Sequence, residues 1–193
     1  MIKKYLSDKI PTFFFNHTTG QPFEFCNACG EHLDGRKYII EKVFKQNLLF
    51  NKAEIVYEYA ICFKCSSSMQ GEISDESMQN ITNLFKEYQQ NVMMKLDYLH
   101  STEKYDIESW IESCSFTGKS TKICEEFTVT GIVEDNSLVF EQSPIVVSDQ
   151  FLELVQESLS KSTKDAFDGL RDKILVDSPT IEDIINTPTI GIF

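Results

Sequence analysis

The chain has 193 residues, of which 41% are hydrophobic and 12% aromatic, so it can form one sizeable packed domain or two small ones and is not a disordered chain. Its formal net charge is -12. Residues 1–100 carry 11 basic and 12 acidic side chains, whereas residues 101–193 carry 7 and 18. Because nucleic-acid affinity comes largely from Lys and Arg that displace counterions, this charge makes the chain a poor candidate for broad binding to a nucleic-acid backbone.

Neither a membrane span nor a secretory signal is predicted. The longest apolar runs, such as residues 13–15, are far below the roughly 18 residues that a span needs. The N-terminus lacks the apolar core and the small-residue cleavage site of a signal peptide. We therefore expect a cytoplasmic protein with no membrane partner.

Four of the six cysteines form two C-x-x-C pairs, Cys26 with Cys29 and Cys62 with Cys65. Two residues between paired thiolates let both sulfurs bind one ion from a tight turn, and Gly30 supplies the permissive backbone after the first pair. In a reducing compartment such pairs more often bind metal than form disulfides. These four cysteines are the predicted ligands of one structural Zn²⁺.

The 32 residues between the pairs must fold back to bring the thiolates together. Residues 37–45 are rich in β-branched and aromatic side chains, residues 46–52 offer a turn, and residues 54–61 alternate apolar side chains on one face. This pattern predicts a β-hairpin that leads directly into the second cysteine pair.

A long helix is predicted after the second pair. Ser74 can cap its N-terminus, and Asp75 and Glu76 favour the positive end of the helix dipole. Apolar residues then recur at three- and four-residue steps along roughly 20 residues, which is typical of a helix with one apolar face. The members of this stripe are Met78, Ile81, Phe85, Tyr88, Val92 and Leu96.

The order of cysteine knuckle, hairpin and a second pair that opens a helix resembles a treble-clef zinc finger. It is most similar to the zinc-binding domain at the front of the ClpX protein-unfolding ATPase, over residues 26–69 only. The resemblance implies a fold and does not by itself specify a function. Metal-free cysteine pairs or a redox dithiol are compatible with the same C-x-x-C motifs. A redox pair, however, is expected within a larger βαβ pattern that is not predicted here. Four thiolates also suit iron, and the helical second pair favours zinc.

A degenerate second copy is predicted at residues 114–160. At an offset of 88 residues Cys26 aligns with Cys114, and Cys29 aligns with Thr117. At an offset of 86 the second cysteine pair aligns with Ser148 and Phe151. An offset of 89 aligns the first hairpin strand with residues 126–136. Small insertions in loops reconcile these offsets.

The second copy keeps one of the four ligand positions, so it is predicted to bind no metal. Ser148 is expected to cap a helix, and Cys114 and Cys124 are expected to be buried as small hydrophobic residues. A structural zinc contributes roughly 10–16 kcal/mol to folding, and a buried apolar side chain about 1.5–3 kcal/mol. About five additional core residues would therefore be needed. The candidates are Phe116, Phe127, Val129, Val133, Phe140, Val146, Val147 and Phe151.

No catalytic residue is predicted. Three histidines occur, His17, His32 and His100, and four cysteines already fill the coordination of zinc, which leaves no open position for an activated water. His32 lies close to Cys29 in the chain, where a structural or solvent-facing role is favoured. The sequence favours a non-enzymatic protein, although it does not exclude an enzyme with an unrecognised site.

The predicted fold class is α+β, with two tandem treble-clef or zinc-ribbon-like units joined by the long helix. Residues 1–100 form the zinc-binding domain, and residues 101–193 form the metal-free repeat with an apolar tail. We expect a protein–protein interaction or adaptor module whose partner is a protein; the sequence does not specify its oligomeric state. The alternative is a nucleic-acid-associated regulator that uses the basic hairpin at residues 36–52. Its basic side chains are Arg36, Lys37, Lys42, Lys45 and Lys52, which we expect to form a solvated hairpin surface.

Overall fold

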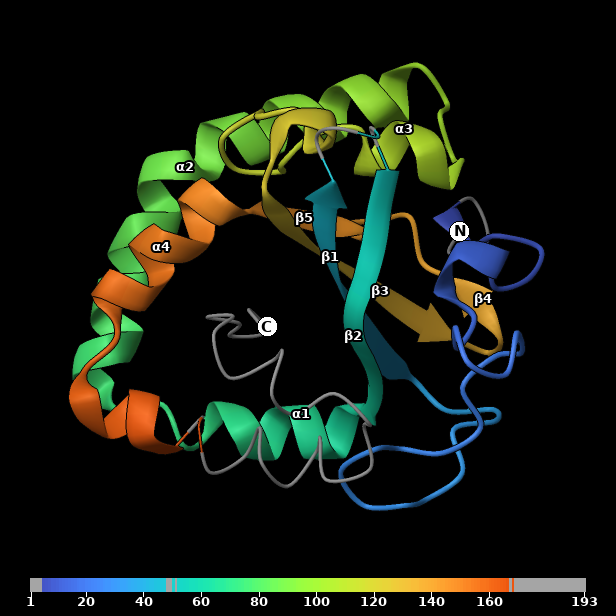
Figure 1. Ribbon diagram of the computed structural model, residues 1–193, viewed down its shortest axis with the longest axis horizontal. Helices are drawn as coiled ribbons and strands as arrows, with labels where there is room; N and C mark the ends of the chain where they lie inside the picture. Colours follow the sequence, from blue (N-terminus) through green and yellow to red (C-terminus); the bar gives the residue numbers. More distant parts are fainter. Residues whose placement is uncertain (1–4, 48–49, 51, 167, 169–193) are drawn as a thin grey trace.

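The computed structural model describes residues 5–47, 50, 52–166 and 168. Helices flank an antiparallel five-stranded sheet (Figure 1), which confirms the predicted α+β class. The strands are β1 (Tyr38–Asn47), β2 (Lys52–Cys62), β3 (Glu126–Glu134), β4 (Ser137–Leu138) and β5 (Ile145–Ser148). The α-helices are α1 (Phe63–Gln70), α2 (Asp75–Ser101), α3 (Ile107–Ile111) and α4 (Asp149–Ser158), and short 3₁₀ turns occur at Thr12–Phe14 and Thr121–Ile123.

The predicted hairpin is present as β1 and β2. The two strands pair antiparallel from Tyr38 opposite Cys62 to Asn47 opposite Lys52. Their β-branched and aromatic side chains fit the pleated, half-buried surface that such strands provide. Because β2 ends at Cys62 and α1 begins at Phe63, the hairpin carries the second cysteine pair to the base of β1.

The sheet crosses from the first half of the chain to the second through β1 and β3. These central strands pair antiparallel, with Tyr38 opposite Val133 and Glu41 opposite Thr130. Thr130 Oγ1 donates a hydrogen bond to the Glu41 carboxylate at 3.2 Å. β2 then lies outside β1, and β5 pairs with β3. Residues 1–100 and 101–193 therefore contribute strands to one sheet, and their division into two domains stays a prediction.

The N-terminal segment packs on this sheet. The buried Phe14 ring approaches Gly131 so closely that a Cβ there would lie 2.6 Å from the Phe14 Cζ atom. Lys42 is also buried; its Nζ donates to the Phe15 carbonyl at 2.6 Å and forms an ion pair with Glu58. The prediction that Lys42 belongs to a solvated hairpin surface was therefore wrong, because its ammonium group holds the N-terminal segment against β1.

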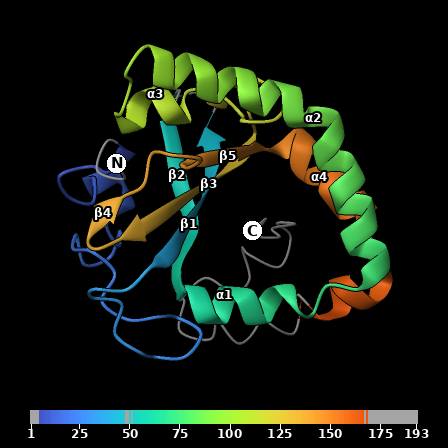
Figure 2. The ribbon, with the colours of Figure 1, turned by 180° about the vertical axis from the view of Figure 1, so that it is seen from behind.

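Helix α2 begins where the sequence predicts, because the Ser74 side chain accepts a hydrogen bond from the Ser77 amide. The predicted apolar stripe is half-buried except at Met78, which is 42% exposed. α2 lies alongside α4 in both ribbon views (Figures 1 and 2), whereas α1 runs from the end of β2 toward the start of α2.

Among the described helices, none combines the length and the apolar character that a membrane crossing requires. The predicted apolar tail, which ends in Ile190, Ile192 and Phe193, lies outside the described residues.

Candidate metal centre

The first cysteine pair lies in a tight turn before β1. The Gly30 amide donates to the Cys26 carbonyl at 2.8 Å, and the Cys26 amide donates to the Glu31 carbonyl at 2.8 Å. Gly30 has a φ of +70°, a conformation that side chains with a Cβ rarely adopt. The turn reverses the chain and brings the Cys29 thiol beside that of Cys26.

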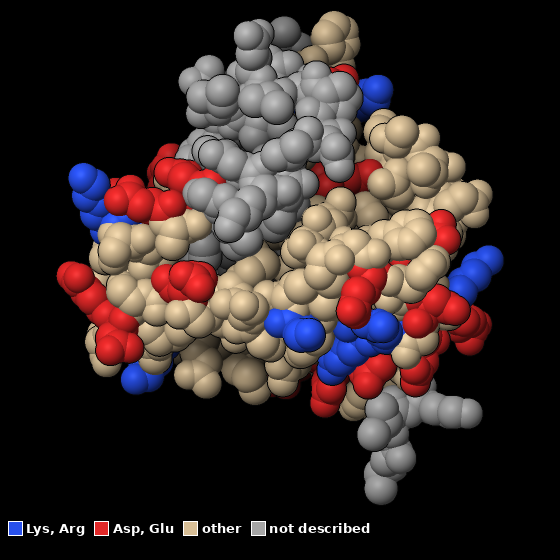
Figure 3. All heavy atoms as spheres, turned by 90° about the horizontal axis from the view of Figure 1, so that it is seen from below, with Lys and Arg blue, Asp and Glu red and all other residues tan. Residues whose placement is uncertain are grey.

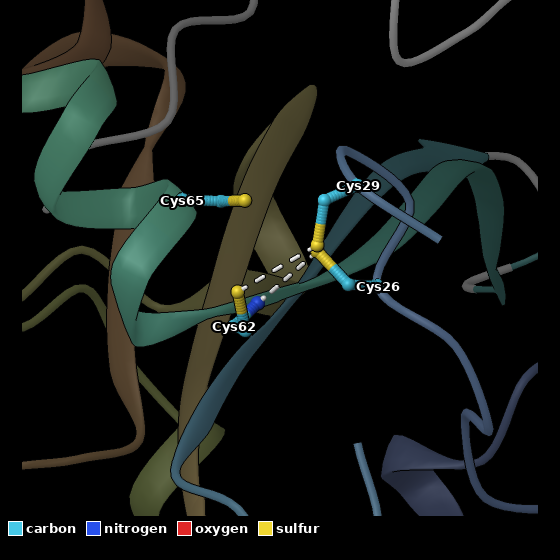
Figure 4. Close-up of side chains that lie close together, drawn as sticks. All are labelled: Cys26, Cys29, Cys62 and Cys65. Atoms are coloured by element: carbon cyan, nitrogen blue, oxygen red, sulfur yellow. Dashed lines mark hydrogen bonds between the residues drawn. The ribbon is translucent and has the colours of Figure 1, made fainter. Parts of the chain in front are cut away.

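The second pair approaches from the opposite side, with Cys62 at the end of β2 and Cys65 in the first turn of α1 (Figure 4). The Cys62 amide donates to Cys26 Sγ at 3.4 Å, and the Sγ atoms of Cys29 and Cys62 are 4.0 Å apart. All four Sγ atoms lie within 4.8 Å of one another, so they could hold a metal ion. We call these four cysteines the front site.

The electrostatics of the front site fit a set of side chains that could hold a cation. Burial raises the pKa of the Cys26 thiol, but hydrogen bonds from backbone amides, first that of Cys62, outweigh burial and lower the pKa below its usual value. The pKa of Cys65 is raised, first by burial and then by its contacts with Cys62 and Cys29. Four thiols this close cannot all ionise without a cation between them.

The front site lies at the protein surface. Cys26 and Cys62 are buried, Cys65 is half-buried and Cys29 is exposed. The aromatic residues that adjoin the buried ligands in the chain are exposed as well, Phe25 by 47% and Phe63 by 39%. One side of the site therefore contacts the sheet, and the other faces solvent.

The turn at Cys114 repeats this backbone. The Gly118 amide donates to the Cys114 carbonyl at 3.1 Å, and the Cys114 amide donates to the Lys119 carbonyl at 2.8 Å. Gly118 has a φ of +71°. The Ser148 amide donates to Cys114 Sγ at 3.4 Å, and the hydroxyl oxygens of Thr117 and Ser148 are 3.3 Å apart. We call Cys114, Thr117, Ser148 and Phe151 the back site.

In the back site, Ser148 and Phe151 occupy the positions of the second pair of thiols. Phe151 is completely buried, and its ring stacks on that of Phe116 at 4.1 Å. From α2, the ring centroid of Phe85 lies 5.9 Å from Phe151 and that of Tyr88 lies 5.0 Å from it. The prediction that Ser148 caps a helix is confirmed, because its side chain accepts from the Phe151 amide.

The predicted burial of the two remaining cysteines is also confirmed, with Cys114 and Cys124 at 1% and 0% exposure. The eight apolar candidates for replacing the metal are buried too. However, most of them align with residues of the first hairpin that are also buried. They therefore do not enlarge the core of the second unit relative to that of the first. Phe116 and Phe151, which align with Ala28 and Cys65, are the clearest gains.

None of the three histidines belongs to the group of ligand-type side chains found in the described part of the chain. His32 packs against Phe25 with the rings tilted and their centroids 4.3 Å apart, and its Nδ1 is 3.9 Å from a Glu24 oxygen. His100 lies at the far end of α2, where its Nε2 is 2.9 Å from the Glu141 carbonyl oxygen.

Most of the basic hairpin residues are neutralised by acidic neighbours. Arg36 pairs with Glu31. Lys37 Nζ lies 3.5 Å from a Glu134 oxygen. Lys45 is exposed, but it lies between two acidic cross-strand neighbours, Glu54 and Glu126. On the face seen from below, basic and acidic side chains are interspersed (Figure 3).

Comparison with protein-family models, curated proteins and solved structures found no match to this chain.

Proposed function

We propose that this chain is a non-enzymatic adaptor that uses one structural Zn²⁺ at the front site to hold a protein-binding surface in shape. The observation that carries the proposal is the convergence of four thiols, from a tight turn and from a strand–helix junction, to within 4.8 Å of one another. One ion would bind both the tight turn and the strand–helix junction, which are separated in the chain by the β1–β2 hairpin.

The geometry suits zinc. A tetrahedral site with Zn–S bonds of about 2.3 Å places neighbouring sulfurs about 3.8 Å apart. The Sγ atoms of Cys29 and Cys62, at 4.0 Å, are already near that separation. Four thiolates fill the tetrahedron, so zinc in this site would stabilise the fold and would not activate water. When bound, it would cross-link the tight turn that holds Cys26 and Cys29 to helix α1.

We further propose that the chain consists of two tandem treble-clef-like units, of which the second is metal-free. Support comes from the turns at Cys26 and Cys114, which share the same amide-to-carbonyl bonds and a glycine of positive φ. The Cys62 and Ser148 amides make the matching bond to the first sulfur of each turn. The β1–β3 pairing places Glu41 opposite Thr130, its own counterpart at the offset of 89 residues, as a two-fold relation between the units requires.

A protein partner is favoured by the side chains around the front site. Phe25 and Phe63 are exposed directly beside two buried ligands. At the matching back positions stand the polar residues Ser113 and Asp149. Exposed aromatic residues are enriched where proteins bind one another. Nucleic acid is disfavoured by the net charge of -12 and by the ion pairs of Arg36 and Lys37.

Partner capture from native lysate tests the adaptor role. The zinc-loaded chain is compared with a Phe25→Ser/Phe63→Asp variant, in which the two aromatic residues are replaced by their back counterparts. A Phe50→Ser variant is the control, because Phe50 is 78% exposed and lies on the hairpin loop. We expect the same proteins to be captured by the wild type and by the control but lost with the double variant.

Retention on a polyanion resin at physiological salt separates the two functional classes. An adaptor with this charge should flow through, since few counterions would be released. Retention that is abolished by reversing the charge of Lys45 or Lys52 would instead support the nucleic-acid role and contradict the proposal.

A further inference from the structure

An open cavity of about 540 Å³ lies between the N-terminal segment, the chain on either side of the first cysteine turn, and the β3–β4 turn. The N-terminal segment reaches this end of the sheet by running beside β4 (Figure 1), where the Ser7 amide donates to the Leu138 carbonyl at 3.0 Å. We call it the N-terminal cavity. It shares no residue with the front site or the back site, and its volume lies in the range of about 300–1,000 Å³ that is typical of small-molecule sites. Its apolar walls are Ile10, Phe15, Pro22 and Phe23.

The acidic rim of the cavity is held in place by hydrogen bonds. The Leu33 amide donates to the Glu24 carbonyl at 2.9 Å, which brings Glu24 and Asp34 to the same side of the cavity. Asn136, on the β3–β4 turn, donates from Nδ2 to Asp34 Oδ1 at 2.9 Å. Within the described part of the chain, Asp34 Oδ2 makes no hydrogen bond. The Asp34 carboxylate is therefore positioned by one oxygen and can accept from a ligand with the other.

Tyr38 supplies a buried polar group to the same cavity. It is the first residue of β1 and shares a sheet face with Lys42, whose Nζ contacts the Phe15 carbonyl, so the Tyr38 ring extends beneath the N-terminal segment. Tyr38 is 1% exposed, and its hydroxyl makes no hydrogen bond to any residue that the structure describes. Burial, and then the charge of Asp34, raises the pKa of Tyr38 to about 12, so the hydroxyl stays protonated. Buried polar groups without a partner are rare, and a ligand would satisfy this one.

The charges around the cavity favour a cation. Two carboxylates, those of Glu24 and Asp34, line it together with one ammonium group, that of Lys9, and all three side chains belong to exposed residues. The whole chain carries a net charge of -12, which raises the local concentration of cations further. The apolar walls require that the cation also carry an apolar body.

We propose that the N-terminal cavity binds a small organic cation, an apolar body about the size of one aromatic ring that carries a primary ammonium group. The ammonium group donates to Asp34 Oδ2 and to the Tyr38 hydroxyl oxygen, while the apolar body packs against Phe15 and Phe23. A small molecule is favoured over a single side chain of a protein partner because the volume is that of a ligand site. The site needs no metal, so it is independent of the proposed zinc.

Titration of the full chain with three phenyl compounds tests the charge preference. Phenethylamine, 2-phenylethanol and 3-phenylpropionate share one ring and differ in charge, and NMR of the aromatic side chains reports both affinity and place. We expect phenethylamine to shift the ring signals of Phe15, Phe23 and Tyr38 and to bind at least about threefold more tightly than the alcohol. Equal binding of amine and alcohol would overturn the proposal. Tighter binding of the acid would assign the cavity to anions through Lys9, which also contradicts it.

Two variants locate the ammonium group. Asp34→Asn keeps an oxygen that can accept from Asn136 but removes the charge, and Tyr38→Phe removes the unpartnered hydroxyl. Each should weaken phenethylamine binding by at least about threefold. Asp135→Asn is the matched control, because Asp135 is exposed, does not line the cavity and has a φ of +50° that Asn tolerates. Equal losses in Asp34→Asn and Asp135→Asn would show that net charge alone attracts the amine and would refute the site.

A fourth probe separates a small molecule from a protein partner. N-acetyl-lysine methylamide presents the same ammonium group on the side chain of a peptide unit. We expect it to bind more weakly than phenethylamine, since it covers less of the apolar wall. Tighter or equal binding would assign the cavity to a basic side chain of a partner protein and would contradict the proposal.

Discussion

The front and back sites have similar backbone conformations, but different side chains occupy their matching positions. Both turns reverse the chain through a glycine of positive φ and receive an amide hydrogen bond on their first sulfur. Four thiols converge at the front, whereas stacked phenylalanine rings fill the back. One chain geometry can therefore be closed either by ligands for an ion or by apolar packing.

The comparison also shows that ring packing at the back needs a helix. Phe151 and Phe116 are buried because Phe85 and Tyr88 of α2 cover them. A metal site needs no such cover to form, since bonds to the ion hold the segments together. Exposure at the front and burial at the back are thus what the proposed metal at the front and the packed rings at the back would produce.

The largest effect should separate Cys26→Ser from Cys114→Ser, the same change at matching positions. A structural zinc contributes about 10–16 kcal/mol, as much as the whole stability of a typical domain. Cys26→Ser should therefore lose the metal and unfold the knuckle and α1, whereas Cys114→Ser should lose about 1 kcal/mol and keep the metal. Elemental analysis and urea unfolding of each variant measure both effects. Full metal content in Cys26→Ser would contradict the claim that the front site, unlike the back site, depends on a bound metal.

Removing a ring from the back site should be the next largest effect. Phe151→Ala deletes a completely buried side chain from the stack, and such changes lower the free energy of unfolding by about 3–5 kcal/mol. Zinc content should not change. Phe63→Ala, at an exposed position beside the front site, serves as the control and should change stability by about 0.5 kcal/mol or less. Chemical denaturation of the two variants gives the comparison, and equal losses would contradict it.

At one matched position of the central strands a carboxylate stands opposite a hydroxyl, because β1 has Glu41 where β3 has Thr130. Complete burial raises the pKa of Glu41 to about 7, although hydrogen bonds from Tyr59 and Thr130 oppose the shift. Because the folded state holds the proton more tightly, Glu41 stabilises the fold fully below about pH 4.3, its unfolded pKa. This contribution is lost as the pH rises through about 7.

Glu41→Gln should remove that pH dependence. The difference in unfolding free energy between wild type and variant should change by on the order of 3 kcal/mol between pH 4.5 and 8. Thr130→Val, which removes a hydrogen bond that favours the ionised form, should keep the dependence and move it to higher pH. Urea midpoints measured across this range test both variants. A wild-type curve parallel to that of Glu41→Gln would show that Glu41 does not titrate as expected.

The smallest effect concerns two helix caps that contact each other: Ser74 caps α2, Ser160 precedes the helical residues 161–166, and their hydroxyl oxygens are 2.9 Å apart. Ser74→Ala and Ser160→Ala should each destabilise the protein by about 1 kcal/mol, since each removes a helix cap. The double variant should lose less than the sum, because both hydroxyls belong to one hydrogen-bonded cluster. Thermal unfolding of the three variants tests this. Strict additivity, or an effect of Ser74→Ala alone, would argue against a two-fold relation.

Local features of the fold were predictable from the sequence. The hairpin, the caps at Ser74 and Ser148 and the convergence of the two cysteine pairs follow from short-range patterns. The caps and each cysteine pair depend on neighbours within one turn or helix, and the convergence of the two pairs follows from the hairpin between them.

Long-range packing was not predictable in the same way. Nothing near Lys42 in the chain indicates that its ammonium group meets the Phe15 carbonyl, and the pairing of β1 with β3 spans about 90 residues of sequence. The burial of Glu41 was missed for the same reason, since Tyr59 and Thr130 reach it from two other strands. The cap at Ser160 could have been found, because it aligns with Ser74 at the offset of 86 residues.

X-ray absorption at the zinc edge, on the chain as purified, tests the central claim most directly. The account predicts one zinc per chain with four sulfur neighbours at about 2.3 Å and no nitrogen or oxygen in the shell. Absence of zinc, or a shell that contains fewer than four sulfurs, would contradict the claim that the front site is closed by a metal and the back site by rings.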